Sequence, residues 1–346
     1  QSRAEQSRAE QSRAEQSRAV KVSVIVPVFN GEKYIKNCIE MLLNQGETYY
    51  EIVVINDGST DNTAQIMQAY QSNRKVLYYE QNNKGVSAAR NKGIEISNGD
   101  WIMFCDVDDE VKTGYITDIF NQIQENPECD MFCYARYSAG IADYEHDEMN
   151  VDNADTLKRI LNSDCYDYFL RSVWGTVFKK NFLQQKRVFF HEGIPFSEDT
   201  LFMLQAASEY KTIKYIHRGY YKYCLRSDGT VCSGGSEKDL SGYRLLKNGL
   251  KQLECTYKML WKAPEIQQMV SDWLIDIGMY AIGRVRRGTI QMPLQKRKQM
   301  IKGMCFLIKS NITIEQKLRE KRKIYIIEKL PIVYILMGDL KGKLGR

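Results

Sequence analysis

Short apolar runs alternate with amphipathic stretches along the chain from Val20 onward. Runs of β-branched and aromatic residues typical of buried strands occur at Val22–Val28, Glu51–Ile55, Val76–Glu80 and Trp101–Cys105. Apolar residues at helical spacing predict helices over Glu32–Gln45, from Asp61 through Tyr70, and over Ser87–Ser97. A helix over Thr113–Asn126 and a strand over Asp130–Ala135 follow. This alternation predicts an α/β fold with a doubly wound, mostly parallel sheet flanked by helices.

The pattern is less regular beyond Ala135. Residues 140–154 are acidic and loop-like, and a helix that Ser197 can cap is expected over Phe196–Tyr210. Two short strands, Lys214–His217 and Tyr220–Cys224, precede a glycine-containing loop, and after Ser236 the chain is predicted to be helical. We therefore expect a polar tail at 1–19, an α/β domain at 20–237 and a helical C-terminal extension at 238–346.

The tail at 1–19 repeats QSRAE and has no apolar stripe wider than Ala, so it cannot bury itself. It is a solvated tail, an expression tag or a product of repeated coding DNA, and it is excluded from the fold. The 9 cysteines lack C-x-x-C spacing, which is typical of reduced thiols in a cytosolic protein. The sequence predicts neither a signal peptide nor a membrane-spanning helix.

Charge is distributed unevenly along the chain. The formal charge is +6 over all 346 residues, but from Lys238 onward 23 lysines and arginines stand against 9 acids. The C-terminal part thus carries +14 and the part before it −8, which predicts an anionic surface as a partner of the C-terminal part. Lysine and arginine clusters alternate there with apolar stripes. This pattern suits an amphipathic element that lies on a membrane, and it equally suits helices that pack their apolar faces on the α/β domain or on a second subunit. Nucleic acid is not expected as a partner, because aromatic and basic residues are not interleaved.

The stretch WIMFCDVDDE, Trp101–Glu110, carries the strongest candidate for a site. Its strand runs into Asp106, Asp108 and Asp109, and ligands bind at the carboxyl edge of open parallel sheets. In extended backbone, Asp106 and Asp108 face the same side. Two converging carboxylates repel each other unless a cation joins them, and oxygen ligands favour Mg²⁺ or Mn²⁺. The pattern predicts a metal–diphosphate site, although acid pairs also occur in solvated loops.

Several ordered blocks of the chain together resemble the family 2 inverting glycosyltransferases of the GT-A fold. The matching blocks are Val22–Ile35 (VSVIVPVFNGEKYI), Ile55–Thr63 (INDGSTDNT), Asn83–Gly93 (NKGVSAARNKG), Asn98–Val111 (NGDWIMFCDVDDEV), Ser197–Phe202 (SEDTLF) and, more weakly, Tyr220–Ser233 (YYKYCLRSDGTVCS). The resemblance runs from about Val20 to about Gly235. It implies a transferase of bacterial surface-glycan assembly that moves a sugar from a nucleotide donor, expected to be a UDP-sugar, to a hydroxyl of a lipid-linked or polysaccharide acceptor.

The resemblance also implies a donor site. Its donor-binding residues are Pro27, Phe29, Asp57, Lys84, Arg90, Asp106 and Arg226, and its metal ligands are Asp108 and Asp106. Phe29 offers an aromatic face and Asp57 can accept from the imide of uracil, although an Asp before Gly58 is also an ordinary turn residue. Arg218 is an alternative to Arg226 as the phosphate contact.

The acceptor side is implied by later blocks. Asp199 matches the base that removes the proton of the attacking hydroxyl, and Glu198 matches a contact to the acceptor or the nearby backbone. Both acids also fit ordinary charges at a helix N-terminus. Trp174 matches an aromatic residue near the acceptor, although Gly175 stands where the family often has Asn. A single displacement then inverts the sugar without a covalent intermediate.

The resemblance places such an enzyme in the cytoplasm, at the inner face of the membrane. One alternative is a non-catalytic nucleotide-sugar-binding or scaffold protein of the same fold. Such a protein would be expected to have lost the base or the metal pair, and this chain keeps both. A nucleotidyltransferase would need a Gly-rich basic loop after the first strand, which FNGEKYI does not supply.

Overall fold

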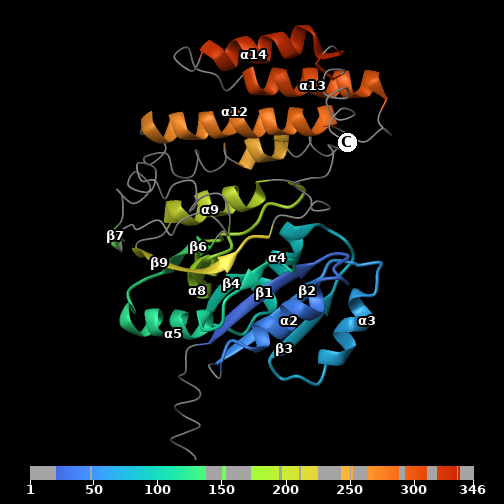
Figure 1. Cartoon of the computed structure of the whole chain (residues 1–346). Coiled ribbons are helices and arrows are strands. Elements are labelled where there is room, and N and C mark those ends of the chain that lie inside the picture. The colour runs from blue at the N-terminus through green and yellow to red at the C-terminus, as the bar shows by residue number, and fades with distance from the viewer. Residues whose placement is uncertain are drawn as a thin grey trace, which may run out of the picture. The chain divides into compact units, whose positions relative to one another are not determined.

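The computed structural model describes residues 21–46, 49–137, 150–152, 173–194, 197–209, 212–224, 243–249, 251, 264–287, 293–309, 318–332 and 334–335. The chain forms two compact units, whose elements are labelled in Figure 1. The first contains residues 1–153, 173–189 and 209–224, and the second contains residues 154–172, 190–208 and 225–346. The predicted boundary near Lys238 lies outside the described residues.

The first unit is built on a mixed sheet of order β3-β2-β1-β4-β8-β6-β9-β5, in which β7 also pairs with β9. Its parallel half consists of β3 (Val76–Glu80), β2 (Tyr50–Asn56), β1 (Val22–Val28) and β4 (Trp101–Phe104). The other half consists of β8 (Thr176–Lys179), β6 (Met131–Tyr137), β9 (Thr212–Lys222), β5 (Glu110–Val111) and β7 (Asn150–Asp152). β8 runs antiparallel to both β4 and β6, whereas β6 and β9 are parallel. The predicted α/β fold is confirmed, and the four predicted parallel strands are all present.

Helices cover both faces of the parallel half. Successive side chains of its strands point to opposite faces, and because both sets are apolar, both faces must be covered. They are α2 (Ile35–Leu43), α3 (Thr63–Met67) with the short η1 (Gln68–Tyr70), α4 (Val86–Ile96), α5 (Tyr115–Glu125) and α8 (Lys180–Gln185). Val24 and Val26 of β1 share a buried cluster with Ile39 of α2. Ile25 points to the other face, where a Cβ added to Gly93 of α4 would overlap it. The sheet is therefore wound on both sides.

A proline lies inside the central strand β1 without breaking the sheet. Pro27 pairs with Ile55 of β2, whereas the pairing of β1 with β4 ends at Ile25. The missing N–H of proline therefore falls where β1 has only one neighbouring strand. The pairing of β1 with β4 ends at this point, because β4 itself ends at Phe104.

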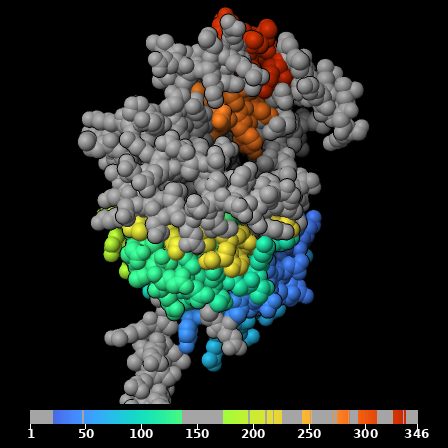
Figure 2. Space-filling view, turned by 60° about the vertical axis from the view of Figure 1, so that its left-hand side comes forward, coloured from blue at the N-terminus to red at the C-terminus, as the bar shows by residue number. Residues whose placement is uncertain are grey.

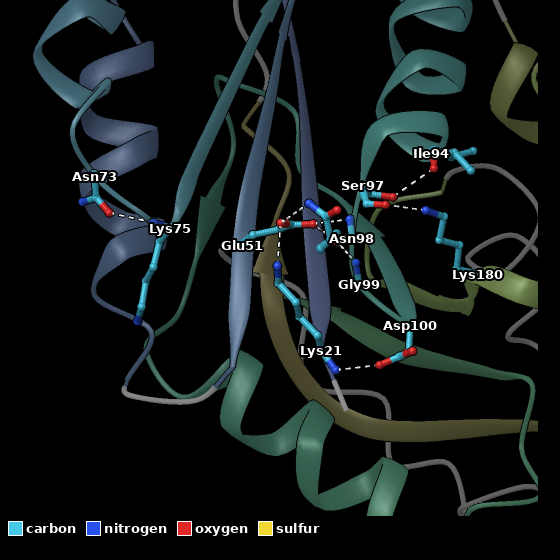
Figure 3. A network of polar contacts seen from close by, with 11 residues as sticks. Lys21, Glu51, Asn73, Lys75, Ile94, Ser97, Asn98, Gly99, Asp100 and Lys180 are labelled. Carbon is cyan, nitrogen blue, oxygen red and sulfur yellow. Dashed lines mark hydrogen bonds and ion pairs between the residues drawn. The ribbon is translucent and has the colours of Figure 1, made fainter. Parts of the chain in front are cut away.

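The amino ends of the parallel strands are tied together by Glu51 (Figure 3). Its buried carboxylate accepts hydrogen bonds from Lys21 Nζ at 2.7 Å, Ser23 Oγ at 2.6 Å and the Asn98 backbone N–H at 2.5 Å. Burial raises the pKa of Glu51, but these hydrogen bonds outweigh it, so the pKa lies below its ordinary value. These contacts join the starts of β1, β2 and β4, at the edge opposite the one where Asp106, Asp108 and Asp109 follow β4.

Two expectations for the later strands are wrong. The two short strands predicted at 214–217 and 220–224 are one strand, β9, because Gly219 does not turn the chain. A register shift opposite β9, between Tyr134 and Arg136 of β6, absorbs the irregularity while pairing continues to Lys222. The acidic segment predicted as a loop contains β7, which pairs antiparallel with β9; residues 138–149 lie outside the described part.

The described part of the second unit is helical, as predicted. It contains α9 (Glu198–Glu209, of which Glu209 belongs to the first unit), α12 (Pro264–Arg287), α13 (Leu294–Lys309) and α14 (Leu318–Lys329). Phe190 stacks on Phe202 of α9 with ring centroids 4.1 Å apart, and the Tyr243 hydroxyl donates to the Leu274 carbonyl of α12 at 2.8 Å. Within the described ranges, each helix is too short or too polar to cross a bilayer.

Candidate functional site

The three acids that follow β4 lie on a turn at the carboxyl edge of the sheet, so the extended backbone expected for Asp106 and Asp108 is wrong. Cys105 still donates its backbone N–H to the Ile25 carbonyl at 3.0 Å, and the turn closes where Asp109 N donates to the Asp106 carbonyl at 3.1 Å. A Cβ added to Gly31 would lie 3.6 Å from Val107, so the turn lies against the loop that follows β1. We call residues 106–109 the acidic turn.

Arg90 of α4 pairs with the acidic turn. Its Nη2 atom lies 3.0 Å from Asp106 Oδ1, and the Arg90 side chain is almost fully buried whereas that of Asp106 is partly exposed. A buried guanidinium strongly favours a nearby anion, because its own desolvation is costly. The structure thus brings together two predicted donor-binding residues from different elements.

Asp109 is buried beneath the turn. Its Oδ2 accepts from the Tyr221 hydroxyl at 2.6 Å and its Oδ1 accepts from the Cys224 backbone N–H at 2.8 Å. Burial and the charge of Asp106 raise the pKa of Asp109 to about 7, although both hydrogen bonds oppose the rise. Asp109 therefore anchors the acidic turn to β9.

Asp57 organises the loop that leads into α4. Its Oδ1 accepts from Gln81 Nε2 at 2.8 Å and from the Lys84 backbone N–H at 2.9 Å, and its Oδ2 accepts from the Gly85 N–H at 2.7 Å. Gly58 follows with φ of +73°, and a Cβ there would lie 2.7 Å from Asn83 N. The turn role weighed for Asp57 is therefore present, and its contact to a base stays a prediction.

Hydrogen bonds to residues that follow β2 hold the loop after β1 in place. The Asn30 backbone N–H donates to Ser59 Oγ and the Gly31 N–H donates to Thr63 Oγ1, at 2.8 and 2.9 Å. Pro27 is buried within β1, whereas Phe29 is 50% exposed. Phe29 therefore presents an accessible ring at the carboxyl edge, as a stacking role for a base requires.

Trp174 stacks on two tyrosines, one in β9 and one directly after it. The ring centroids lie 5.1 Å from Tyr221 and 5.3 Å from Tyr223, at interplanar angles of 15° and 3°. Trp174 is thereby placed beside the partner of Asp109. Gly175 adopts φ of +78°, a conformation that Gly and Asn adopt most readily.

Arg218 is engaged elsewhere in the first unit. Its Nη2 lies 3.1 Å from Asp118 Oδ1 and its Nε donates to Asp118 Oδ2 at 3.2 Å. In Figure 2, α5 in green and β9 in yellow lie side by side, and this ion pair joins them. The geometry favours a structural role for Arg218, and Arg226 lies outside the described residues.

The predicted acceptor-side acids begin α9. Glu198 and Asp199 occupy its first turn, and Asp199 Oδ1 accepts from the Thr200 backbone N–H at 2.8 Å. The preceding Ser197 has φ of +57°. Both acids belong to the second unit, whereas the acidic turn belongs to the first. Their predicted roles stay predictions.

A divalent cation fits the chemistry of the acidic turn. Within the described residues, no group of three His, Cys, Asp or Glu side chains forms a complete metal cage. Mg²⁺ and Mn²⁺ sites often combine one or two carboxylates with substrate phosphates, so Asp106 and Asp108 suffice. The like charges of Asp106 and Asp108 that raise the pKa of Asp109 mark an excess of negative charge that a cation would relieve.

The fold and the acidic edge define an α/β protein of the GT-A type. Residues 23–186 match the family described as "Glycosyl transferase family 2", which confirms the resemblance stated above.

Curated relatives agree with this assignment. The chain is 30% identical over 229 residues to "Glycosyltransferase GlyA" of Streptococcus pneumoniae, which covers 63% of this chain and 32% of that protein. It is 28% identical to "Uncharacterized glycosyltransferase EpsJ" of Bacillus subtilis, over 58% of this chain and 60% of EpsJ. The chain thus spans less than two thirds of the length of these relatives.

Among solved structures, that of S. aureus TarS 1-349 in complex with UDP-GlcNAc matches with a TM-score of 0.67. The match covers 94% of this chain and 93% of that chain, at 19% identity. Similarity at this level of identity establishes the shared fold, including helices beyond the α/β part.

Proposed function

We propose that this chain is an inverting, metal-dependent glycosyltransferase. It would move a sugar, a hexose by our expectation, from a UDP-sugar to a hydroxyl of a lipid-linked or polysaccharide acceptor. The observation that carries the proposal is the buried Arg90 held 3.0 Å from Asp106 on an acidic turn, at the carboxyl edge of a family 2 sheet. TarS, whose fold the chain shares, was solved with UDP-GlcNAc, which supports a UDP-sugar as donor.

The donor would lie along the carboxyl edge of the first unit. In this proposal Phe29 stacks on the base, Asp57 accepts from the imide N–H, and Arg90 orients the diphosphate. Lys84, on the loop held by Asp57, adds positive charge beside it. Asp108 would hold Mn²⁺ or Mg²⁺ together with Asp106. When bound, the cation would supply electrostatic stabilisation of the leaving diphosphate.

The acceptor side needs a base and a surface for the incoming sugar. We propose that Asp199 removes the proton of the attacking hydroxyl while that oxygen displaces the diphosphate at the anomeric carbon. Glu198 would contact the acceptor, and Trp174 would contribute aromatic surface beside it. A single in-line displacement of this kind inverts the anomeric configuration, and no protein nucleophile is needed.

A screen of UDP-sugars for slow hydrolysis in the presence of Mn²⁺ tests the proposal. Water can replace the acceptor in such a site, so the correct donor should release UDP without the acceptor being known. The control is the Asp108→Ala variant, which should release none above background. A chain that binds a UDP-sugar but neither hydrolyses nor transfers it would instead be a binding or scaffold protein.

We further propose that the second unit contacts an anionic membrane surface, at the inner face of the membrane. Five large apolar side chains of the described part are exposed on α13, α14 and the turn that follows: Leu294 (38%), Phe306 (71%), Tyr325 (55%), Ile326 (57%) and Leu330 (54%). Lys309 and Lys329 each place Nζ within 6 Å of the Tyr325 ring centre, at 5.8 and 5.7 Å. Apolar groups beside lysines suit an interface with anionic lipid, as does the +14 charge of the C-terminal region.

A further inference from the structure

Tyr221 contacts the acidic turn at two points although it lies on a distant strand. Its buried hydroxyl donates to Asp109 Oδ2 at 2.6 Å and accepts from the Asp106 backbone N–H at 3.0 Å. Asp106 and Asp109 are the first and last residues of the turn, so one oxygen atom bridges its two ends. The turn also closes on itself through Asp109 N and the Asp106 carbonyl.

The position of this hydroxyl is itself well determined. Tyr221 pairs with Val111 of β5, the strand that begins directly after the acidic turn. Its ring stacks on Trp174 at 5.1 Å, and the side chain is fully buried. Strand pairing on one side and ring stacking on the other leave the hydroxyl little freedom to move.

The contact also explains how the turn tolerates a buried acid. Asp109 is excluded from water, and an unpaired buried carboxylate is strongly unfavourable. Tyr221 and the Cys224 N–H together supply donors to both of its oxygens. Removing the Tyr221 hydroxyl would leave Asp109 Oδ2 without this donor, and the turn would be expected to shift toward water.

We propose that Tyr221 is a positioning residue for the metal–diphosphate site. By fixing the ends of the acidic turn, its hydroxyl holds Asp106 and Asp108 in the arrangement that binds a divalent cation and a diphosphate. Tyr221 itself touches neither ligand. The proposal rests on the proposed function, since it assigns Tyr221 to the same donor site.

The test compares Tyr221→Phe with Tyr115→Phe by calorimetric titration of UDP, with and without Mn²⁺. Tyr115 is a matched control, because it is fully buried in the same unit and stacks on the adjacent Tyr220, yet its hydroxyl has no hydrogen-bond partner among the residues that the structure describes. We expect Tyr221→Phe to weaken Mn²⁺-dependent UDP binding about tenfold, the scale of one lost hydrogen bond to a charged group. Its metal-free UDP affinity and the binding by Tyr115→Phe should match the wild type.

The outcomes separate the two proposals. Wild-type protein that binds no UDP with Mn²⁺ would overturn the proposed function and this inference with it. Wild-type binding that Tyr221→Phe retains in full would overturn only the inference. An equal loss of UDP affinity with and without metal would also overturn it, because that pattern indicates general loss of structure.

A second variant covers the case in which Tyr221→Phe folds poorly, which thermal melting would reveal. Asp109→Asn alters the same contact from the other side and should weaken Mn²⁺-dependent binding similarly. Because both changes act on one contact, the double variant should have about the same Mn²⁺-dependent UDP affinity as the single variant with the lower affinity. Losses that add in full would count against the bridge between the ends of the turn.

Discussion

The Arg90 guanidinium and the Asp106 carboxylate, 3.0 Å apart, join helix α4 to the acidic turn. Only 5% of the Arg90 side chain is exposed, against 28% of that of Asp106. The cation is therefore buried while the acid remains partly accessible at the sheet edge. A fixed positive charge behind an accessible acid is suited to a ligand that brings both phosphate and a metal ion.

The coupling between these two residues is the first prediction. Arg90→Met and Asp106→Asn should each lower the free energy of unfolding by about 3 kcal/mol, because each disrupts a buried ion pair. The double variant should lose at least 1 kcal/mol less than the sum, on the order expected for groups in contact. Urea denaturation measures all four free energies. The control cycle uses the Lys92–Glu95 pair, also 3.0 Å apart, in which the Glu95 side chain is 69% exposed and that of Lys92 24%, and whose coupling should stay below about 1 kcal/mol.

The second prediction concerns Asp108. Asp108→Ala should weaken UDP binding in Mn²⁺ by about tenfold or more, since it removes the carboxylate that we propose as a ligand to the cation. Calorimetry with and without EDTA measures the effect. Asp100→Ala is the control, because Asp100 is an acid directly before the start of the same strand, where it accepts from the Lys21 N–H. UDP affinity that is independent of metal in the wild type would refute the metal site.

The third prediction separates catalysis from binding. Asp199→Asn should leave UDP affinity unchanged while sugar transfer falls about 10²–10⁴-fold, the usual effect of losing a general base. Glu209→Gln, at the other end of α9, is the control and should keep full activity. Transfer is followed by UDP release with the donor found in the hydrolysis screen. Near-normal transfer by Asp199→Asn would mean that another group takes the proton.

Part of this site follows from sequence pattern. The resemblance placed Arg90 and Asp106 in one donor site, and the two residues lie on consecutive parts of the chain, α4 and the turn after β4. Regular alternation also predicted the four parallel strands and the helices between them. Local patterns of this kind depend on residues close in the chain.

The remaining contacts depend on pairings between distant residues. Tyr221 lies 112 residues beyond Asp109, and nothing in YYKYC indicates which tyrosine is buried against the acid. The continuity of β9 likewise depends on its partner β6, whereas the sequence Arg218-Gly219 locally favours a turn. The donors that hold Asp57 come from a loop with no regular pattern.

The fourth prediction is a pH effect at the opposite edge of the sheet. The folded-state pKa of Glu51 is lowered from 4.5, so its contribution to stability is present above pH 4.5 and is lost as pH falls through the lower folded value. Glu51→Gln should therefore destabilise the protein by about 2–3 kcal/mol at pH 7, the scale of hydrogen bonds to a charged group. The difference in free energy of unfolding between the wild type and Glu51→Gln should narrow below pH 4.5. A difference that stays constant with pH would contradict the assignment.

The fifth prediction concerns the exposed apolar residues of the second unit. The triple variant Phe306→Glu, Ile326→Glu and Leu330→Glu should partition at least about tenfold less onto vesicles containing phosphatidylglycerol, because it removes apolar contact and adds repulsion. Tyr49→Glu, which alters an exposed aromatic of the first unit, is the control and should bind like the wild type. Co-sedimentation at low and high salt measures binding, and high salt should weaken it. Equal binding to neutral phosphatidylcholine, or concentration-dependent self-association that only the triple variant abolishes, would instead assign this surface to uncharged lipid or to a second copy of the chain.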